Sequence, residues 1–67
     1  MNPIGSYCLS NTTSIIVYQI DYYEELVLAG INNNNPVWCK MYYYTSTDEY
    51  GFMFGKLFVP FSEVMRV

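Results

Sequence analysis

Three carboxylates that stand close together in the sequence, Asp21, Glu24 and Glu25, are the side chains best placed for chemistry. They can attract a basic partner or hold a hard cation, or they can keep an exposed strand edge in water. Asp48 and Glu49 are expected to be a solvated turn. Hydrolysis by paired carboxylates needs two of them about 5–10 Å apart in a cleft, and a chain of 67 residues has little room for one.

The cysteines and the absence of histidine exclude most other chemistry. Without His, neither a Ser-His-Asp nor a Cys-His nucleophile can be assembled. Cys8 and Cys39 cannot supply the four ligands of a structural zinc site, and they show no CxxC redox spacing. We therefore expect no enzyme activity, no metal and no cofactor. Two free thiols are expected, with a disulfide as the alternative.

The charge balance argues against nucleic acids and membranes as partners. Three basic residues stand against six acidic ones, whereas nucleic-acid binding needs clustered Lys and Arg. The apolar runs are far shorter than the roughly 20 residues that cross a bilayer. No basic start leads into an apolar stretch, so we expect no signal peptide and a cytoplasmic location.

The eight tyrosines are the most informative feature of the composition. In a strand, Tyr43 must point away from Tyr42 and Tyr44, because successive side chains alternate. Some rings must therefore lie outside, and tyrosine is enriched in the cores of interfaces. The alternative is that the rings pack flat on a fold too small to hide them. The predicted binding surface is an aromatic face of Tyr22, Trp38, Tyr42 and Tyr44 with Asp21, Glu24 and Glu25 at its rim.

Strands must position these residues, because 28 of the 67 residues are Val, Ile, Tyr, Phe, Trp or Thr and only one is Ala. Pro, Gly, Ser and Asn are frequent in residues 1–13, so this N-terminal segment is expected to be coil-like. The asparagine run before Pro36 predicts a hairpin loop. The predicted strands cover residues 14–20, 25–31, 37–45, 50–54 and 57–59.

Alternation within the predicted strands assigns their faces. In the first strand, Ile20 is expected on the face of Ile16 and Tyr18, opposite Ile15 and Val17. In the strand over residues 37–45, Lys40 prefers water. The face that carries Cys39 is therefore expected to be inside.

The C-terminal residues leave two folds open. Pro60 ends a short strand, and Ser62 is placed to cap one helical turn before an extended end. The alternative is a helix over residues 62–67, which would give an α+β fold. We predict a single all-β domain over residues 1–67, with a strongly bent five-stranded antiparallel sheet closed into a small barrel.

Residues 24–67 resemble the Src-homology-3 type of small barrel in the order of residue types. An acidic loop precedes a strand, Trp38 lies in the next strand, and Pro60 precedes one tight turn and a final short strand. The resemblance implies a barrel with an aromatic groove for proline-rich peptides. Glu63 stands where that family has a groove tyrosine, and the Ala-Leu-Tyr-Asp-Tyr signature is absent.

From these features we expect a non-enzymatic protein-interaction module, or a small inhibitor-like adaptor, that binds a protein partner. The aromatic face would make the contact and the acidic rim would orient it. The alternative is a structural or assembly protein that forms homo-oligomers through strand edges and exposed tyrosines.

Overall fold

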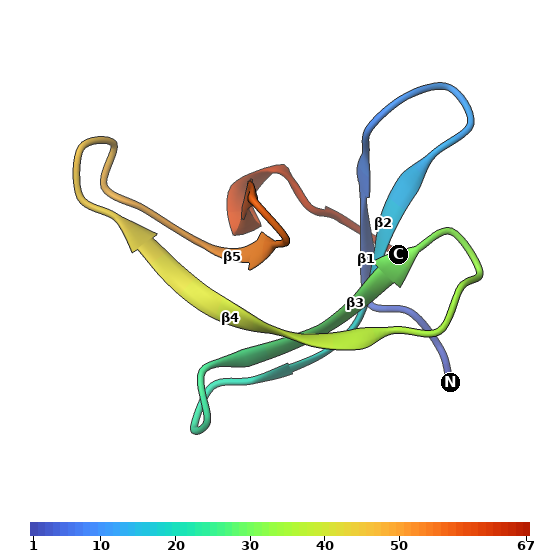
Figure 1. The fold of residues 1–67 in the computed structure, drawn as a ribbon, viewed down its shortest axis with the longest axis horizontal. Coiled ribbons are helices and arrows are strands. Elements are labelled where there is room, and N and C mark those ends of the chain that lie inside the picture. Colours follow the sequence, from blue (N-terminus) through green and yellow to red (C-terminus); the bar gives the residue numbers. More distant parts are fainter.

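A computed structural model describes all 67 residues as one curled antiparallel sheet (Figure 1). The strand order in the sheet is β6-β5-β4-β3-β2-β1-β7. The predicted all-β class is confirmed. The strands are β1 (Gly5–Cys8), β2 (Ser14–Asp21), β3 (Leu26–Ile31), β4 (Val37–Tyr44), β5 (Glu49–Phe54), β6 (Leu57–Pro60) and β7 (Met65–Arg66), and the 3-10 helix η1 (Phe61–Glu63) joins the last two.

The sheet curls because β4 changes partners halfway along its length. Its first half, Val37–Lys40, pairs with β3, and its second half, Met41–Tyr44, pairs with β5. Figure 1 shows β4 as a long strand that joins the two halves of the molecule. The segment β6–η1–β7 then returns the chain to β1, with which β7 pairs. The result is a half-barrel with a core on its inner face.

The core contains seven buried side chains from five strands. They are small or β-branched in β2 and β3, and the one large ring among them is Phe52 of β5. Met41, Phe54 and Phe61 are partly buried and pack against this cluster. The core residues are Ile15, Val17, Val27, Ala29, Cys39, Phe52 and Val59.

The sheet has seven strands instead of the predicted five, because both chain ends join it. The expectation of a coil-like N-terminal segment is wrong for Gly5–Cys8, which pairs with β2 on one side and β7 on the other. A Cβ on Gly5 would lie 2.7 Å from Val64 Cγ1 and 2.9 Å from the Met65 carbonyl oxygen. Gly5 therefore allows the close pairing of β1 and β7, although glycine in a local pattern indicates a turn.

The face predicted for Ile20 is also wrong, because β2 contains a β-bulge. Val17 lies opposite Ala29 and Gln19 lies opposite Leu28, so Tyr18 has no partner on β3. One extra residue reverses the alternation beyond it. Ile20 therefore shares the inner face with Ile15 and Val17 and packs against the core.

The loops follow the turn chemistry of the sequence at most positions. Asn32 has a φ of 49° and begins the predicted hairpin loop between β3 and β4. The chain ends in one 3-10 turn and a short strand, so there is no C-terminal α-helix. Ser62 does not cap this turn: η1 begins at Phe61, directly after Pro60, and no side chain caps it.

Candidate functional site

The outer face of β4 carries most of the predicted aromatic residues. Cys39 is buried on the inner face, as expected. Trp38, Tyr42 and Tyr44 point the other way, with exposed fractions of 48%, 48% and 43%. Because the strand alternates, these three rings cannot enter the core without turning Cys39 out of it.

The rings of Tyr42 and Tyr44 meet a third ring, Phe58 of β6. The ring centroids of Tyr44 and Phe58 are 4.9 Å apart at an interplanar angle of 78°, and those of Tyr42 and Tyr44 are 5.5 Å apart at 81°. Tyr42 and Phe58 are 6.1 Å apart at 70°. Such edge-to-face pairs are favourable beyond the area they bury. We call Trp38, Tyr42, Tyr44 and Phe58 the outer aromatic patch.

Gly51 of β5 makes this arrangement possible. It lies between Tyr42 on β4 and Pro60 on β6 in the sheet. A Cβ on Gly51 would lie 2.8 Å from two atoms of the Phe58 ring and 2.1 Å from the Val59 carbonyl oxygen. Phe58 was not among the predicted site residues, and the glycine inside an aromatic strand is the sequence signal that could have indicated a close approach there.

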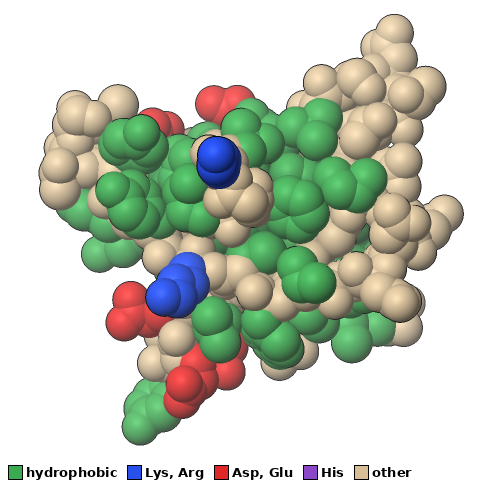
Figure 2. Space-filling model, in the orientation of Figure 1, with side chains coloured by type: hydrophobic (Ala, Val, Ile, Leu, Met, Phe, Trp, Pro, Cys, Tyr) green, Lys and Arg blue, Asp and Glu red, His purple; other side chains and the backbone are tan.

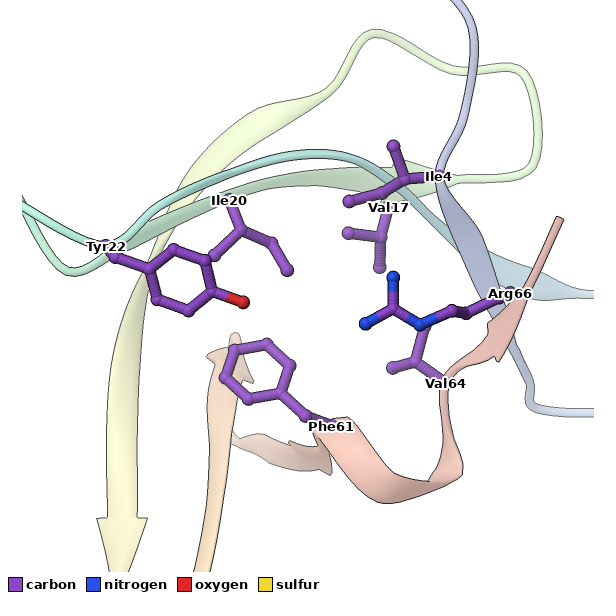
Figure 3. Close-up of a pocket in the computed structure, with 7 residues that line it drawn as sticks. All are labelled: Ile4, Val17, Ile20, Tyr22, Phe61, Val64 and Arg66. Atoms are coloured by element: carbon purple, nitrogen blue, oxygen red, sulfur yellow. The ribbon is translucent and has the colours of Figure 1, made fainter.

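Tyr22 does not belong to the outer aromatic patch, although it was predicted there. Its side chain lines the inner side of the half-barrel, where Figure 3 shows it above Phe61 with its hydroxyl directed toward the centre of a cavity. Tyr43 and Tyr50 also lie on the inner face, with ring centroids 4.6 Å apart. The structure therefore divides the predicted aromatic face between two sides of the sheet.

The predicted acidic rim is the turn between β2 and β3. Asp21 Oδ1 accepts a hydrogen bond of 3.0 Å from the Glu24 backbone N–H. The Met41 backbone N–H donates to the Glu25 carbonyl oxygen at 3.0 Å, which attaches the turn to the middle of β4. Figure 2 shows acidic side chains at the lower left of the molecule, where Figure 1 places this turn. No three Asp, Glu or Cys side chains converge into a metal site.

Both cysteines are free, and they lie in different surroundings. Cys8 is exposed and its thiol lies 3.1 Å from the Ser10 carbonyl oxygen. Cys39 is buried in the core, and burial raises the pKa of its thiol above the ordinary value of 9.0. The Cys39 thiol is therefore a neutral core group.

Comparison with known protein families, curated proteins and solved structures finds no match for this chain. The structure is an all-antiparallel half-barrel, and it supports no assignment to the Src-homology-3 family. Pro60 lies in the same cross-strand row as Tyr42, and Trp38 lies four residues away along β4, so these two residues are not neighbours in a shared groove. No helix of the structure is long and apolar enough to cross a membrane.

Proposed function

We propose that this protein is a protein-interaction module that binds its partner through the outer aromatic patch. The observation that carries the proposal is the cluster of Tyr42, Tyr44 and Phe58, which remains accessible while the core on the other face is already complete. Exposed apolar patches on small proteins mark interaction sites when they are contiguous. Tyr and Trp are also the residue types that contribute most to binding energy in interfaces.

The edge-to-face contacts favour a binding surface over rings that only cover the outside of a small fold. Each ring of the cluster is within 6.1 Å of another ring, so its rotamer is restricted before a partner arrives. A preorganised surface loses less side-chain entropy on binding, and this raises affinity without new contacts. Tyrosine hydroxyls at such a surface can also donate to the backbone of the partner.

The acidic turn supports a partner with basic residues next to its apolar contact. Asp21 and Glu24 lie in this turn next to Glu25, whose side chain lines a cavity on the inner side of the sheet, and the turn is attached to β4 at Met41, one residue from Tyr42. Charges at the rim of an interface mainly accelerate and orient association, and salt screens them. Binding that weakens between low and high salt is therefore expected.

The second candidate function is the formation of homo-oligomers through strand edges. The edge strands of this sheet disfavour such pairing. The edge strand β6 has four residues and ends in Pro60, which has no backbone N–H to donate. The other edge strand, β7, has two residues. Short edges that end in proline are typical of proteins that avoid edge-to-edge pairing.

The test is affinity capture from the native cell with the wild-type chain and the double variant Tyr42→Ser/Tyr44→Ser. The matched control is Tyr23→Ser, because Tyr23 is 92% exposed in the acidic turn and lies outside the patch. We expect the double variant to lose the captured protein and the control to retain it. Retention by a folded double variant would contradict the proposal, and sedimentation at two concentrations would reveal self-association instead.

The free thiols bear on the compartment in which the module acts. Neither Cys8 nor Cys39 is in a disulfide, and disulfides are rare where the medium is reducing. We therefore propose that it acts in the cytoplasm. Labelling of Cys8 with a membrane-permeant thiol reagent in intact cells would test this, because a protein from an oxidising compartment would have Cys8 blocked.

A further inference from the structure

The inner side of the half-barrel contains a second concave surface, which the proposed function does not use. Two adjoining cavities of about 100 Å³ and about 480 Å³ both contact Tyr22 and Phe61. Together they form what we call the inner groove. Its size is in the range of sites that hold small ligands or a few side chains of a peptide. Ile20, Val64 and Arg66 also line the smaller cavity, and Glu25, Met41 and Tyr50 also line the larger one.

The smaller cavity is apolar apart from two polar groups that point into it. Figure 3 shows the side chains of Ile20, Val64 and Phe61 around a common space, with the Tyr22 hydroxyl and the Arg66 guanidinium directed toward its middle. Arg66 is held at this place because β7 pairs it with Gly5. A guanidinium offers two parallel N–H donors that match the geometry of a carboxylate.

The Arg66 guanidinium has no partner within the protein. None of the side-chain hydrogen bonds of the structure involves Arg66, and none involves the Glu25 carboxylate. Glu25 lines the larger cavity together with Met41 and Tyr50. The inner groove therefore has a solvent-exposed cation at its smaller cavity, a solvent-exposed anion at its larger one, and the rings of Tyr22 and Phe61 between them.

We propose that the inner groove binds the C-terminal segment of another polypeptide, which ends in an apolar residue. The last side chain enters the smaller cavity, the terminal carboxylate pairs with Arg66, and a Lys or Arg a few residues upstream faces Glu25. A fatty acid would satisfy Arg66 and the apolar wall, but it has no cation to face the Glu25 carboxylate. The peptide complements both charges.

The test is an NMR titration of the labelled protein with acetyl-Lys-Ala-Ala-Leu as the free acid and as the C-terminal amide. We expect shifts at the amides of Tyr22, Phe61 and Arg66, and binding of the free acid about tenfold tighter than the amide, which corresponds to ~1.4 kcal/mol. Arg66→Gln removes this difference, whereas Arg66→Lys retains part of it. The wild type is expected to bind the lysine peptide more tightly than the same peptide with norleucine in place of lysine. Glu25→Gln removes this preference.

Several outcomes would overturn the proposal. Equal binding of acid and amide would exclude a carboxylate site, and so would an absence of shifts up to about 10 mM peptide, a concentration at which even millimolar affinity is visible. Tighter binding of octanoate than of the peptide would identify a fatty acid as the occupant. The outer-patch variant Tyr44→Ser is expected to bind the peptide normally, so this test is independent of the proposed function.

Discussion

Asn32 connects two loops that lie far apart in the sequence. Its Oδ1 accepts from the Ser14 backbone N–H at 2.8 Å, its Nδ2 donates to the Thr12 carbonyl oxygen at 3.2 Å, and its own backbone N–H donates to Ser14 at 2.8 Å. It also adopts a φ of 49°, which Asn tolerates better than most residues. The β1–β2 loop is thereby fixed to the end of β3.

We predict that Asn32→Ala lowers the free energy of unfolding by about 2–3 kcal/mol, measured in urea, because two side-chain hydrogen bonds are lost and the backbone is strained. The neighbour Asn33 is exposed and its side chain makes none of the hydrogen bonds of the structure. Asn33→Ala should therefore change stability by less than about 0.5 kcal/mol. Equal effects of the two substitutions would contradict the role of Asn32.

The raised pKa of Cys39 predicts a stability change in alkali. The unfolded thiol ionises near its ordinary pKa of 9.0, whereas burial keeps the folded thiol protonated to higher pH. Above pH 9 the unfolded chain binds fewer protons, so the free energy of unfolding must fall as the pH rises toward the folded-state pKa. Below pH 9 the contribution of the Cys39 thiol to the free energy of unfolding is present in full.

The measurement is urea unfolding between pH 7 and pH 10 for the wild type and Cys39→Ala. The two proteins differ only at residue 39, so the difference between the two curves isolates the Cys39 thiol. We expect the wild type to lose stability relative to the variant above pH 9. Parallel curves would show that the Cys39 thiol is accessible to water in the folded state.

At the scale of elements, the β-bulge at Tyr18 determines which residues of β2 enter the core. Ile20 lies opposite Val27 and packs against the core, whereas Gln19 is exposed. We predict that Ile20→Ser lowers the free energy of unfolding by about 2 kcal/mol through lost burial. Gln19→Ser should have less than about 0.5 kcal/mol of effect. A regular strand would require the reverse order, so chemical denaturation of both variants decides between the two arrangements.

A second prediction at the scale of elements concerns the close contact between β5 and β6. Gly51→Ala places a methyl group against the Phe58 ring and the Val59 carbonyl oxygen, and we expect a loss of about 2 kcal/mol or more from overpacking. Gly55→Ala meets no atom within 4 Å, although Gly55 has a φ of 62°. Gly55→Ala should therefore lower the free energy of unfolding by about 1 kcal/mol, because only the backbone conformation is strained. Unfolding curves that rank Gly55→Ala as the more damaging change would contradict the packing of Phe58.

The strands that the sequence predicts are those whose signal is local. The runs over residues 14–20, 25–31 and 37–45 alternate or are β-branched, and each of them coincides with a strand to within one residue at each end. The strand β1 was missed because its stability comes from pairing with β2 and β7, which no local pattern contains. The bulge was missed for the same reason, since it exists only relative to the partner strand β3.

The residues of the candidate site also fall into those that a local pattern predicts and those that only the folded sheet brings together. The outward direction of Trp38, Tyr42 and Tyr44 follows from alternation in one strand, and it is observed. Phe58 contacts these rings because the β5–β6 hairpin brings it next to β4, and no local pattern in the sequence contains that contact. The inner groove could not be predicted, because Tyr22 and Arg66 come together only when the curled sheet brings the β2–β3 turn near the C-terminal strand.

At the scale of the whole molecule, the sheet separates two surfaces of different chemistry. In the outer aromatic patch the rings of Tyr42, Tyr44 and Phe58 pack against one another, and the inner groove is mostly apolar with one cation and one anion at its ends. The acidic turn lies where β2 and β3 meet the middle of β4. We therefore expect a partner that covers the outer patch to leave the inner groove open.

The most direct measurement of the central claim is photo-crosslinking from two adjacent positions of β4 in the native cell. Benzoylphenylalanine replaces Tyr44, on the outer face, or Tyr43, whose ring packs with Tyr50 on the inner face. The account predicts that position 44 crosslinks a protein partner and that position 43, beside Tyr50 of the inner groove, does not crosslink that same protein. Capture of the same protein in equal yield from both positions, or no captured protein from position 44, would contradict the claim that the outer aromatic patch is the binding surface.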